Sequence, residues 1–174
     1  IDFGKALSYA RQRGGQALRA MSFAERGKLL MAMSKALHAH REELLDLETQ
    51  NGGNTRSDGK FDVDGGIGTL AYYAKLGETL GDGQLLSDES TIGLSQSPRW
   101  VGRHVYAPLQ GVAIHINAFN FPAWGFGEKA AVALLAGMPN FHEVPPIPGA
   151  GRFVQWEKPA EFNAILRDFL SDRC

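Results

Sequence analysis

Apolar residues recur at helical spacing through most of the first half of the chain. After Ser22-Phe-Ala-Glu25, which has the serine-to-glutamate spacing of a capping box, leucines and methionines repeat at intervals of three, four and seven as far as Leu47. Asn51-Gly52-Gly53 can then end the helix with left-handed backbone. The pattern predicts one long helix of about 28 residues, roughly 40 Å in length.

The residues on either side of this helix also follow a helical pattern. Gly14-Gly15 interrupts the amphipathic segment before it, which predicts either two short helices or one kinked helix. After it we expect a polar turn at 54–60 and then a helix that begins near Asp62 and Asp64, with both carboxylates at its positive end. Gly81-Asp-Gly83 should end that helix.

Beyond the third helix the pattern changes to strands. Residues 84–98 are rich in small polar residues and predict a surface connection. The runs at 100–106 and 111–117 predict a hairpin or two consecutive strands. The remaining expected elements are a helix at 125–136, a strand near 140–144 and a closing C-terminal helix at 159–171. Together these elements predict an α/β fold in which N-terminal helices pack on a small sheet.

The second of these strands ends at a residue suited to chemistry. The apolar run from Gly111 stops at Asn120-Phe-Pro122 and is followed at once by a helical segment, which places one amide side chain at a strand-to-helix turn. Such an amide can donate to the alkoxide formed when a carbonyl is attacked, which stabilises it by roughly 3–4 kcal/mol. Alternatively, Asn120 bonds neighbouring backbone in an Asx-type turn before the proline. Spacing alone leaves both interpretations open.

Composition limits the class of protein. A chain of 174 residues with 44% hydrophobic residues can bury the core of one domain, with room for an appendage. Its net charge of −1 gives no field that would attract nucleic acid or an anionic membrane, so we expect neither partner. No apolar run is long enough to span a bilayer and no signal-peptide pattern is present, so we expect a cytoplasmic location. The single cysteine, Cys174, agrees with a reducing compartment.

Other candidate residues favour structure over chemistry. His38 and His40 are two residues apart on a predicted helix, where their rings would lie on different faces, so we expect no metal site. The aromatic residues around the asparagine turn could stack a base, but packing of the turn onto the long helix is the commoner use of such residues. These residues are Phe119, Phe121, Trp124 and Phe126.

Several motifs in order resemble the N-terminal part of the ring-opening aldehyde dehydrogenases of phenylacetate catabolism, over about residues 1–140. The motifs are Gly4-Lys-Ala-Leu-Ser-Tyr-Ala10, Phe23-Ala-Glu-Arg26, Asp62-Val-Asp-Gly-Gly-Ile-Gly-Thr69, Val101-Gly-Arg-His-Val105 and the run from Gly111 to Gly125. The resemblance implies a partial Rossmann-like domain that binds NAD or NADP, a small-molecule aldehyde or semialdehyde that is oxidised to an acid, and a strand that joins an oligomerisation sheet in a homo-oligomer.

The same resemblance assigns roles to five consecutive residues. It implies that Asn120 is catalytic, as the support of the oxyanion. The residues implied to line the cofactor and substrate cleft are Ile116, Asn117, Ala118 and Phe119.

The resemblance also implies partners that this chain does not supply. The resembled enzymes use a nucleophilic cysteine, a general-base glutamate and a cofactor-binding lysine, and Glu143 stands where that lysine is expected. A carboxylate there would repel the ribose and phosphate oxygens. Cys174 has no base partner in its terminal tail. We therefore expect a truncated chain that is inactive in isolation and binds the cofactor weakly or not at all.

The last part of the chain resembles a different family. Residues 148–171 are similar to the C-terminal end of α/β-hydrolases, in which a turn bearing the triad histidine precedes a final amphipathic helix. Arg152 takes the place of that histidine and cannot act as a general base, because its guanidinium stays protonated. This predicts a hydrolase-like appendage at 141–174. It leaves two alternatives to a dehydrogenase: an esterase remnant and a non-catalytic oligomerising fragment.

Overall fold

A computed structural model describes most of the chain in two units, Ile1–Phe141 and His142–Cys174. The described residues are 2–88, 90–107, 111–138, the backbone of 140–141, and the single positions 160 and 164. Positions 160 and 164 are helical, and the rest of the expected closing helix, with Glu143, Arg152 and Cys174, lies outside the described residues. The two predicted domains, 1–140 and 141–174, concern ancestry and function and stay a prediction.

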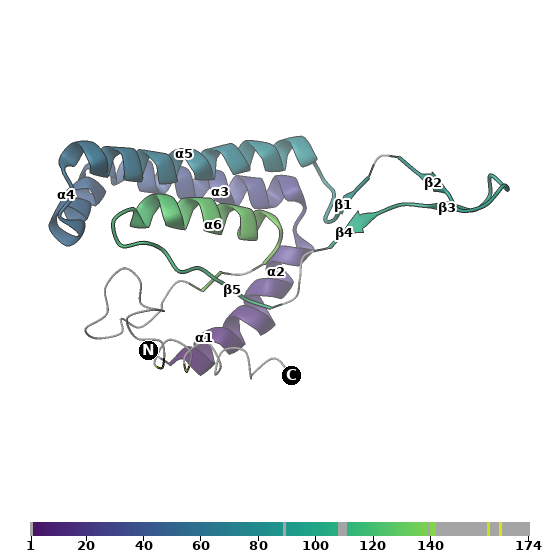
Figure 1. The fold of residues 1–174 in the computed structure, drawn as a ribbon, viewed down its shortest axis with the longest axis horizontal. Coiled ribbons are helices and arrows are strands. Elements are labelled where there is room, and N and C mark those ends of the chain that lie inside the picture. The colour runs from purple at the N-terminus through teal and green to yellow at the C-terminus, as the bar shows by residue number, and fades with distance from the viewer. Residues whose placement is uncertain are drawn as a thin grey trace. The chain divides into compact units, whose positions relative to one another are not determined.

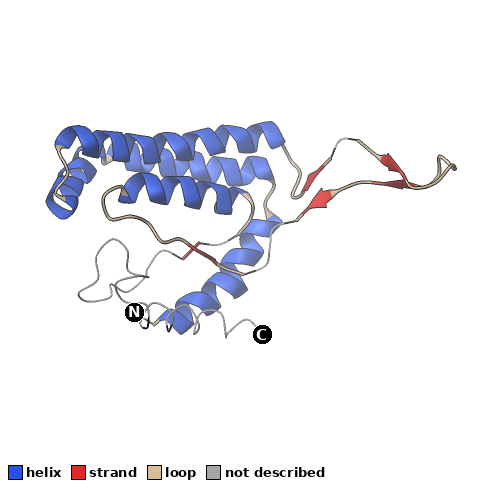
Figure 2. Ribbon diagram, viewed as in Figure 1, coloured by secondary structure: helices blue, strands red, loops and turns tan. Residues whose placement is uncertain are grey.

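The core of the first unit lies between helices (Figures 1 and 2). α3 (Phe23–Ala39) and α6 (Pro122–Leu135) both pack against α5 (Arg56–Leu80). The buried residues of this main cluster are Phe23, Leu30, Leu70, Ala74, Ala131 and Leu135. A second cluster, made of Leu45, Val63 and Ile67, joins α4 (Arg41–Gly52) to α5. The apolar faces of these helices are buried mainly against other helices.

The prediction of one uninterrupted helix from Phe23 onward is wrong. The chain breaks at His40, whose φ of −103° and ψ of 18° are not helical, and α4 continues in a new direction. The break lets Leu45 reach α5 while Leu30 stays in the main core. The predicted ends are confirmed: Ser22 and Glu25 form the capping box, and Gly53 ends α4 with a φ of 69°.

The helices before α3 and after α4 also differ from those that the sequence pattern predicts. α5 begins at Arg56, capped by Thr55, so the expected polar turn at 54–60 is wrong from residue 56 on. Its predicted stop is confirmed at Gly81, where φ is 72°. The N-terminal segment is helical from end to end: its parts are α1 (Phe3–Tyr9), the π-helical turn η1 (Ala10–Gly14) and α2 (Gly15–Ala20). The glycine pair therefore lies where this wide turn passes into α2, within a continuing helix.

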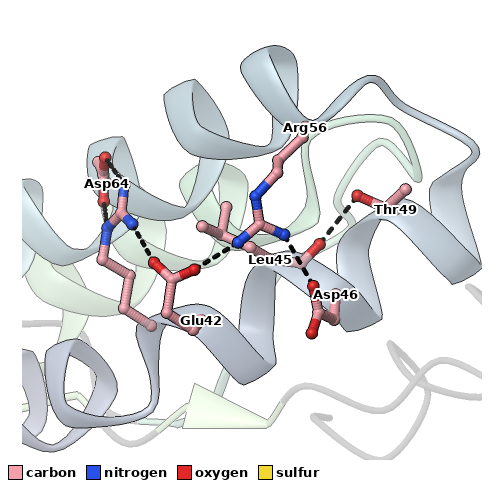
Figure 3. A network of polar contacts seen from close by, with 7 residues as sticks. Glu42, Leu45, Asp46, Thr49, Arg56 and Asp64 are labelled. Atoms are coloured by element: carbon pink, nitrogen blue, oxygen red, sulfur yellow. Dashed lines mark hydrogen bonds and ion pairs between the residues drawn. The ribbon is translucent and has the colours of Figure 1, made fainter.

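A network of charged side chains fastens α4 to α5 (Figure 3). The Arg41 guanidinium donates to both oxygens of Asp64, at 2.6 and 2.7 Å, and to Glu42 at 2.6 Å. Arg56 in turn contacts Glu42 and donates to Asp46 at 2.8 Å. The hydrogen bonds from Arg41 hold the pKa of Asp64 below its usual value.

The strands are short and pair differently from the prediction. The antiparallel pairs are β1 (Leu86–Ser87) with β4 (Val105–Tyr106) and β2 (Ile92–Gly93) with β3 (Val101–Gly102). Residues 84–98 thus supply partner strands. The described residues of 100–106 and 111–117 pair with these strands and with β6 and not with each other, so the alternative of consecutive strands is found and the hairpin is not. β5 (Ala113–Ile114) pairs in parallel with β6 (Asn140–Phe141), within the region where a late strand was expected.

The parallel pair and α6 between its strands make a βαβ unit. This mixture of helices and small sheets is consistent with the predicted α/β class. The expected packing of the N-terminal helices on a sheet is not confirmed, since both buried clusters in the described part consist of helical residues with helical neighbours.

Candidate functional site at the start of α6

The turn between β5 and α6 carries all the site residues expected from the sequence. Ile116 and Phe119 are more than half exposed and Ala118 is exposed, whereas Asn117 and Asn120 are half-buried. The five residues are brought together because they are consecutive, but their side chains do not all reach the surface. Asn117 lies against α6, since a Cβ built at Gly125 would be 3.0 Å from its Oδ1 atom.

Asn120 is held by its backbone and not by its side chain. Its carbonyl oxygen accepts a hydrogen bond of 2.8 Å from Nδ2 of Asn54. Its side-chain Oδ1 is shielded from solvent and accepts no hydrogen bond from the described residues. An Asx-type turn through this oxygen is therefore not formed. A buried acceptor without a partner costs about 1–3 kcal/mol, so this amide is an unusual feature for a purely structural turn.

Asp62, a residue that the sequence placed at the start of its own helix, caps α6 instead. It is fully buried, and its two carboxylate oxygens accept from the backbone N–H groups of Ala123 at 3.0 Å and Trp124 at 2.8 Å. α6 has no side-chain cap of its own, and Pro122 at its start has no N–H. A helix start without Ser, Thr, Asp or Asn was the signal that a distant residue must supply the cap.

Aromatic side chains pack this turn onto α5. The ring centroids of Phe61 and Trp124 are 4.7 Å apart, and those of Phe61 and Phe121 are 6.4 Å apart with the rings nearly perpendicular. A Cβ at Gly65 would lie 2.4 Å from the Trp124 ring, so only glycine leaves room for it. The aromatic residues of the turn were expected to pack on the helix that begins at Phe23, but Phe121 and Trp124 pack on α5 instead. Their partner Phe61 was not predicted from the sequence.

A cavity of about 480 Å³ opens beside the turn, between α4, α5 and α6. Its walls are largely apolar and include Leu44, Val63, Ile67 and Phe126. Glu48 adds a buried carboxylate whose Oε2 has no hydrogen-bond partner among the described residues. Residues 116–120 do not line this cavity, so it is separate from the side chains expected to form the site.

Neither a cluster of metal ligands nor a membrane-spanning helix is found among the described residues. Among them, no three His, Cys, Asp or Glu side chains come close enough together to hold a metal ion. His40 instead contacts Glu43 at 3.2 Å, and His104 contacts Asp88 at 3.0 Å. No helix in the described ranges is both long and apolar enough to cross a membrane.

The β5–α6–β6 unit, with an amide-bearing turn where the strand meets the helix, is a building block of α/β folds. The chain belongs to the aldehyde dehydrogenase family, whose model matches residues 2–140. The resemblance expected over residues 1–140 is therefore confirmed at the level of the family. The hydrolase-like character of the tail stays a prediction.

Relatives and solved structures of this family match the same part of the chain. A 3,4-dehydroadipyl-CoA semialdehyde dehydrogenase from Aromatoleum evansii is 48% identical over 141 residues, which are 81% of this chain and 27% of that protein. A betaine aldehyde dehydrogenase from Bacillus subtilis is 30% identical over 137 residues, 78% of this chain and 26% of that protein.

A crystal structure of a betaine aldehyde dehydrogenase double mutant from Staphylococcus aureus, in complex with NAD+, is similar with a TM-score of 0.66. The sequences are 26% identical, and the match covers 81% of this chain and 26% of that one. The chain thus spans about a quarter of the length of the relatives that it matches.

Proposed function

We propose that this chain carries the beginning of the cofactor domain of an NAD(P)-dependent enzyme that oxidises an aldehyde to an acid. A semialdehyde from aromatic-acid breakdown, of the phenylacetate type, is the substrate class that the 48% identical relative favours. The observation that carries the proposal is Asn120, which lies at the junction of β5 and α6 in a chain matched by the family over residues 2–140. The parallel β5–α6–β6 unit supports a partial Rossmann-like domain.

Asn120 has the chemistry to stabilise an oxyanion. When a thiolate attacks an aldehyde, the carbonyl oxygen becomes an alkoxide, and an amide N–H about 3 Å away lowers the barrier by roughly 3–4 kcal/mol. An amide does this without adding a titratable charge. The donor in this role is Nδ2 of Asn120. Its Oδ1 makes no bond to described backbone, so no Asx-type bond holds the carboxamide in the turn.

The described residues fit one wall of a dinucleotide site. Ile116 and Phe119 offer exposed apolar surface, and Ala118 lets a ligand approach the backbone closely. NAD(P), when bound, accepts the hydride of the aldehyde. Its phosphates need another anchor, because Asp62 already occupies the Ala123 and Trp124 N–H groups that a helix start would otherwise offer to an anion.

The test is a calorimetric titration of the 174-residue chain with NAD and with NADP. We expect weak binding, with dissociation constants near the millimolar range, because only one wall is supplied. A Phe119→Asp variant should abolish it by replacing apolar wall surface with a carboxylate that repels the anionic ligand. Tyr72→Asp, at an exposed position of α5, is the matched control. Heat that stays at the dilution value at millimolar cofactor would reject a cofactor role for residues 116–119 in this chain.

The paired strands before β5 support a homo-oligomer. Large apolar side chains on this segment are more than half exposed: Leu94, Trp100, Val101, Val105 and Tyr106. Exposed apolar strands with unpaired edges favour association with another chain. We propose that this segment joins a sheet of a second copy. Light scattering that shows only monomer at high protein concentration would contradict it. A cytoplasmic location and the lack of a nucleic-acid partner stay predictions from charge and composition.

A further inference from the structure

The turn that carries Asn120 has little internal bonding to fix its geometry. Within it, the Phe121 N–H donates to the Ala118 carbonyl at 3.4 Å, a long hydrogen bond. Gly125 N–H donates to the Phe121 carbonyl at 3.1 Å and belongs to the first turn of α6. The position of the Asn120 backbone therefore depends on groups outside the turn.

One such group is Asn54, in the loop between α4 and α5. Its Nδ2 donates to the Asn120 carbonyl oxygen at 2.8 Å and also to Oε1 of Glu48. An amide nitrogen has two hydrogens, so each of these bonds has its own donor. Glu48 is buried on α4, and it thus fixes the Asn54 amide, which in turn fixes the backbone of Asn120.

The second group is Asp62, on the far side of the turn. Its two oxygens hold successive N–H groups, those of Ala123 and Trp124, just after Pro122. Charge-assisted hydrogen bonds of this kind are about twice as strong as neutral ones. The backbones of α5 and α6 also meet here, since a Cβ at Gly66 would lie 2.5 Å from the Ala123 carbonyl oxygen. The helix start is therefore fixed in register against α5.

We infer that Asn54 and Asp62 are positioning residues for Asn120. One holds the carbonyl of Asn120 and the other holds the N–H groups three and four residues later. The direction of the Asn120 carboxamide is set by Asn54 in the α4–α5 loop and by Asp62 on α5, and not by the turn itself. This inference rests on the proposed function, because it gives Asn120 an orientation that the oxyanion role requires.

The experiment uses the full chain labelled with ¹⁵N-asparagine and with ¹⁵N-labelled backbone. The side-chain NH₂ signal of Asn120 is identified by its loss in Asn120→Gln. Asn54→Ala and Asp62→Asn should each move or split this signal. Asn51→Ala, an exposed asparagine near the end of α4, should leave it in place. Amide exchange at Ala123 and Trp124 should become roughly tenfold faster in Asp62→Ala, and Asp62→Asn, which keeps one acceptor oxygen, should restore part of the protection.

An Asn120 signal that stays superimposable in both Asn54→Ala and Asp62→Asn, with helical circular dichroism retained, would overturn the inference. So would a displacement of equal size in Asn51→Ala. If Asp62→Ala does not fold, Asn54→Ala decides the result, because residue 54 is only half-buried and lies outside both buried clusters. No cofactor or aldehyde is present in these measurements, so a failed NAD(P) titration would reject the proposed function without changing this result.

Discussion

Gly27 of α3 and Gly77 of α5 face each other where the backbones of the two helices are in close contact. A Cβ built at Gly77 would lie 3.0 Å from the Cα of Gly27 and 2.6 Å from the carbonyl oxygen of Phe23. A Cβ at Gly27 would lie 2.6 Å from the carbonyl oxygen of Ala74. Two helix backbones that approach this closely leave no room for a methyl group, so this pair fixes the spacing of the main core.

Gly77→Ala should destabilise the fold by about 1–3 kcal/mol, because the added methyl group forces α3 and α5 apart. Gly68→Ala, on the same helix, is the matched control: nothing lies within 4 Å of its Cβ. That change should stabilise the helix by roughly 0.5–1 kcal/mol through backbone entropy. Urea unfolding of both variants checks the prediction. Equal effects of the two changes would show that α3 and α5 are not in backbone contact.

Leu70→Ala should destabilise the protein by about 2–5 kcal/mol, since Leu70 of α5 is fully buried in the cluster that α5 forms with α3 and α6. Tyr72→Ala, two residues along the same helix and 65% exposed, should cost much less. Urea unfolding followed by circular dichroism measures both. A small effect of Leu70→Ala would mean that the main cluster is not the core of the folded chain in solution.

The ion pair between Arg41 and Asp64 should make stability depend on pH. The folded-state pKa of Asp64 is lowered, chiefly by hydrogen bonds from Arg41. The stabilisation is therefore fully present above the unfolded pKa of about 3.9 and is lost as the pH falls through the folded pKa. Asp64→Asn should lower the urea midpoint at pH 7 and have little effect at a pH below both values.

The effect of salt and a control variant distinguish the contribution of the Arg41–Asp64 ion pair from a general effect of charge on stability. High salt should reduce the difference between Asp64→Asn and the parent chain at pH 7, because Asp64 is half exposed and is screened. Glu78→Gln, an exposed carboxylate near the end of α5, should not lower the midpoint. A midpoint difference for Asp64→Asn that persists unchanged at low pH would contradict an ionic origin.

Asn120→Ala should not destabilise the fold and should raise the free energy of unfolding by up to about 1–3 kcal/mol, because it removes a buried Oδ1 that has no hydrogen-bond partner among the described residues. Asn54→Ala should cost about 1 kcal/mol or more, since it removes the bond to the Asn120 carbonyl and leaves Glu48 without its donor. Thermal unfolding of the two variants makes the comparison. A larger loss for Asn120→Ala than for Asn54→Ala would restore the structural interpretation of Asn120 as a turn residue.

Features that depend on neighbours in the chain could be predicted from the sequence. The capping box of Ser22 and Glu25 is set by three-residue spacing, and the stops at Gly53 and Gly81 are set by the left-handed backbone that glycine allows. The turn at Asn120 before Pro122 could also be predicted, because it too depends on residues that are neighbours in the chain. The break at His40 was missed because the apolar spacing runs through it without interruption, and only the second cluster around Leu45 requires it.

The sequence by itself determined the helical first half, the helix ends and the place of Asn120 before α6, because these depend on backbone preferences within a few residues. Tertiary structure decided which strands pair, that Asp62 caps a helix 61 residues away, and that Asn54 holds the Asn120 carbonyl. Those contacts join residues far apart in the chain. Local spacing carries no information about such partners, whose choice is made only when the helices bury their apolar faces together.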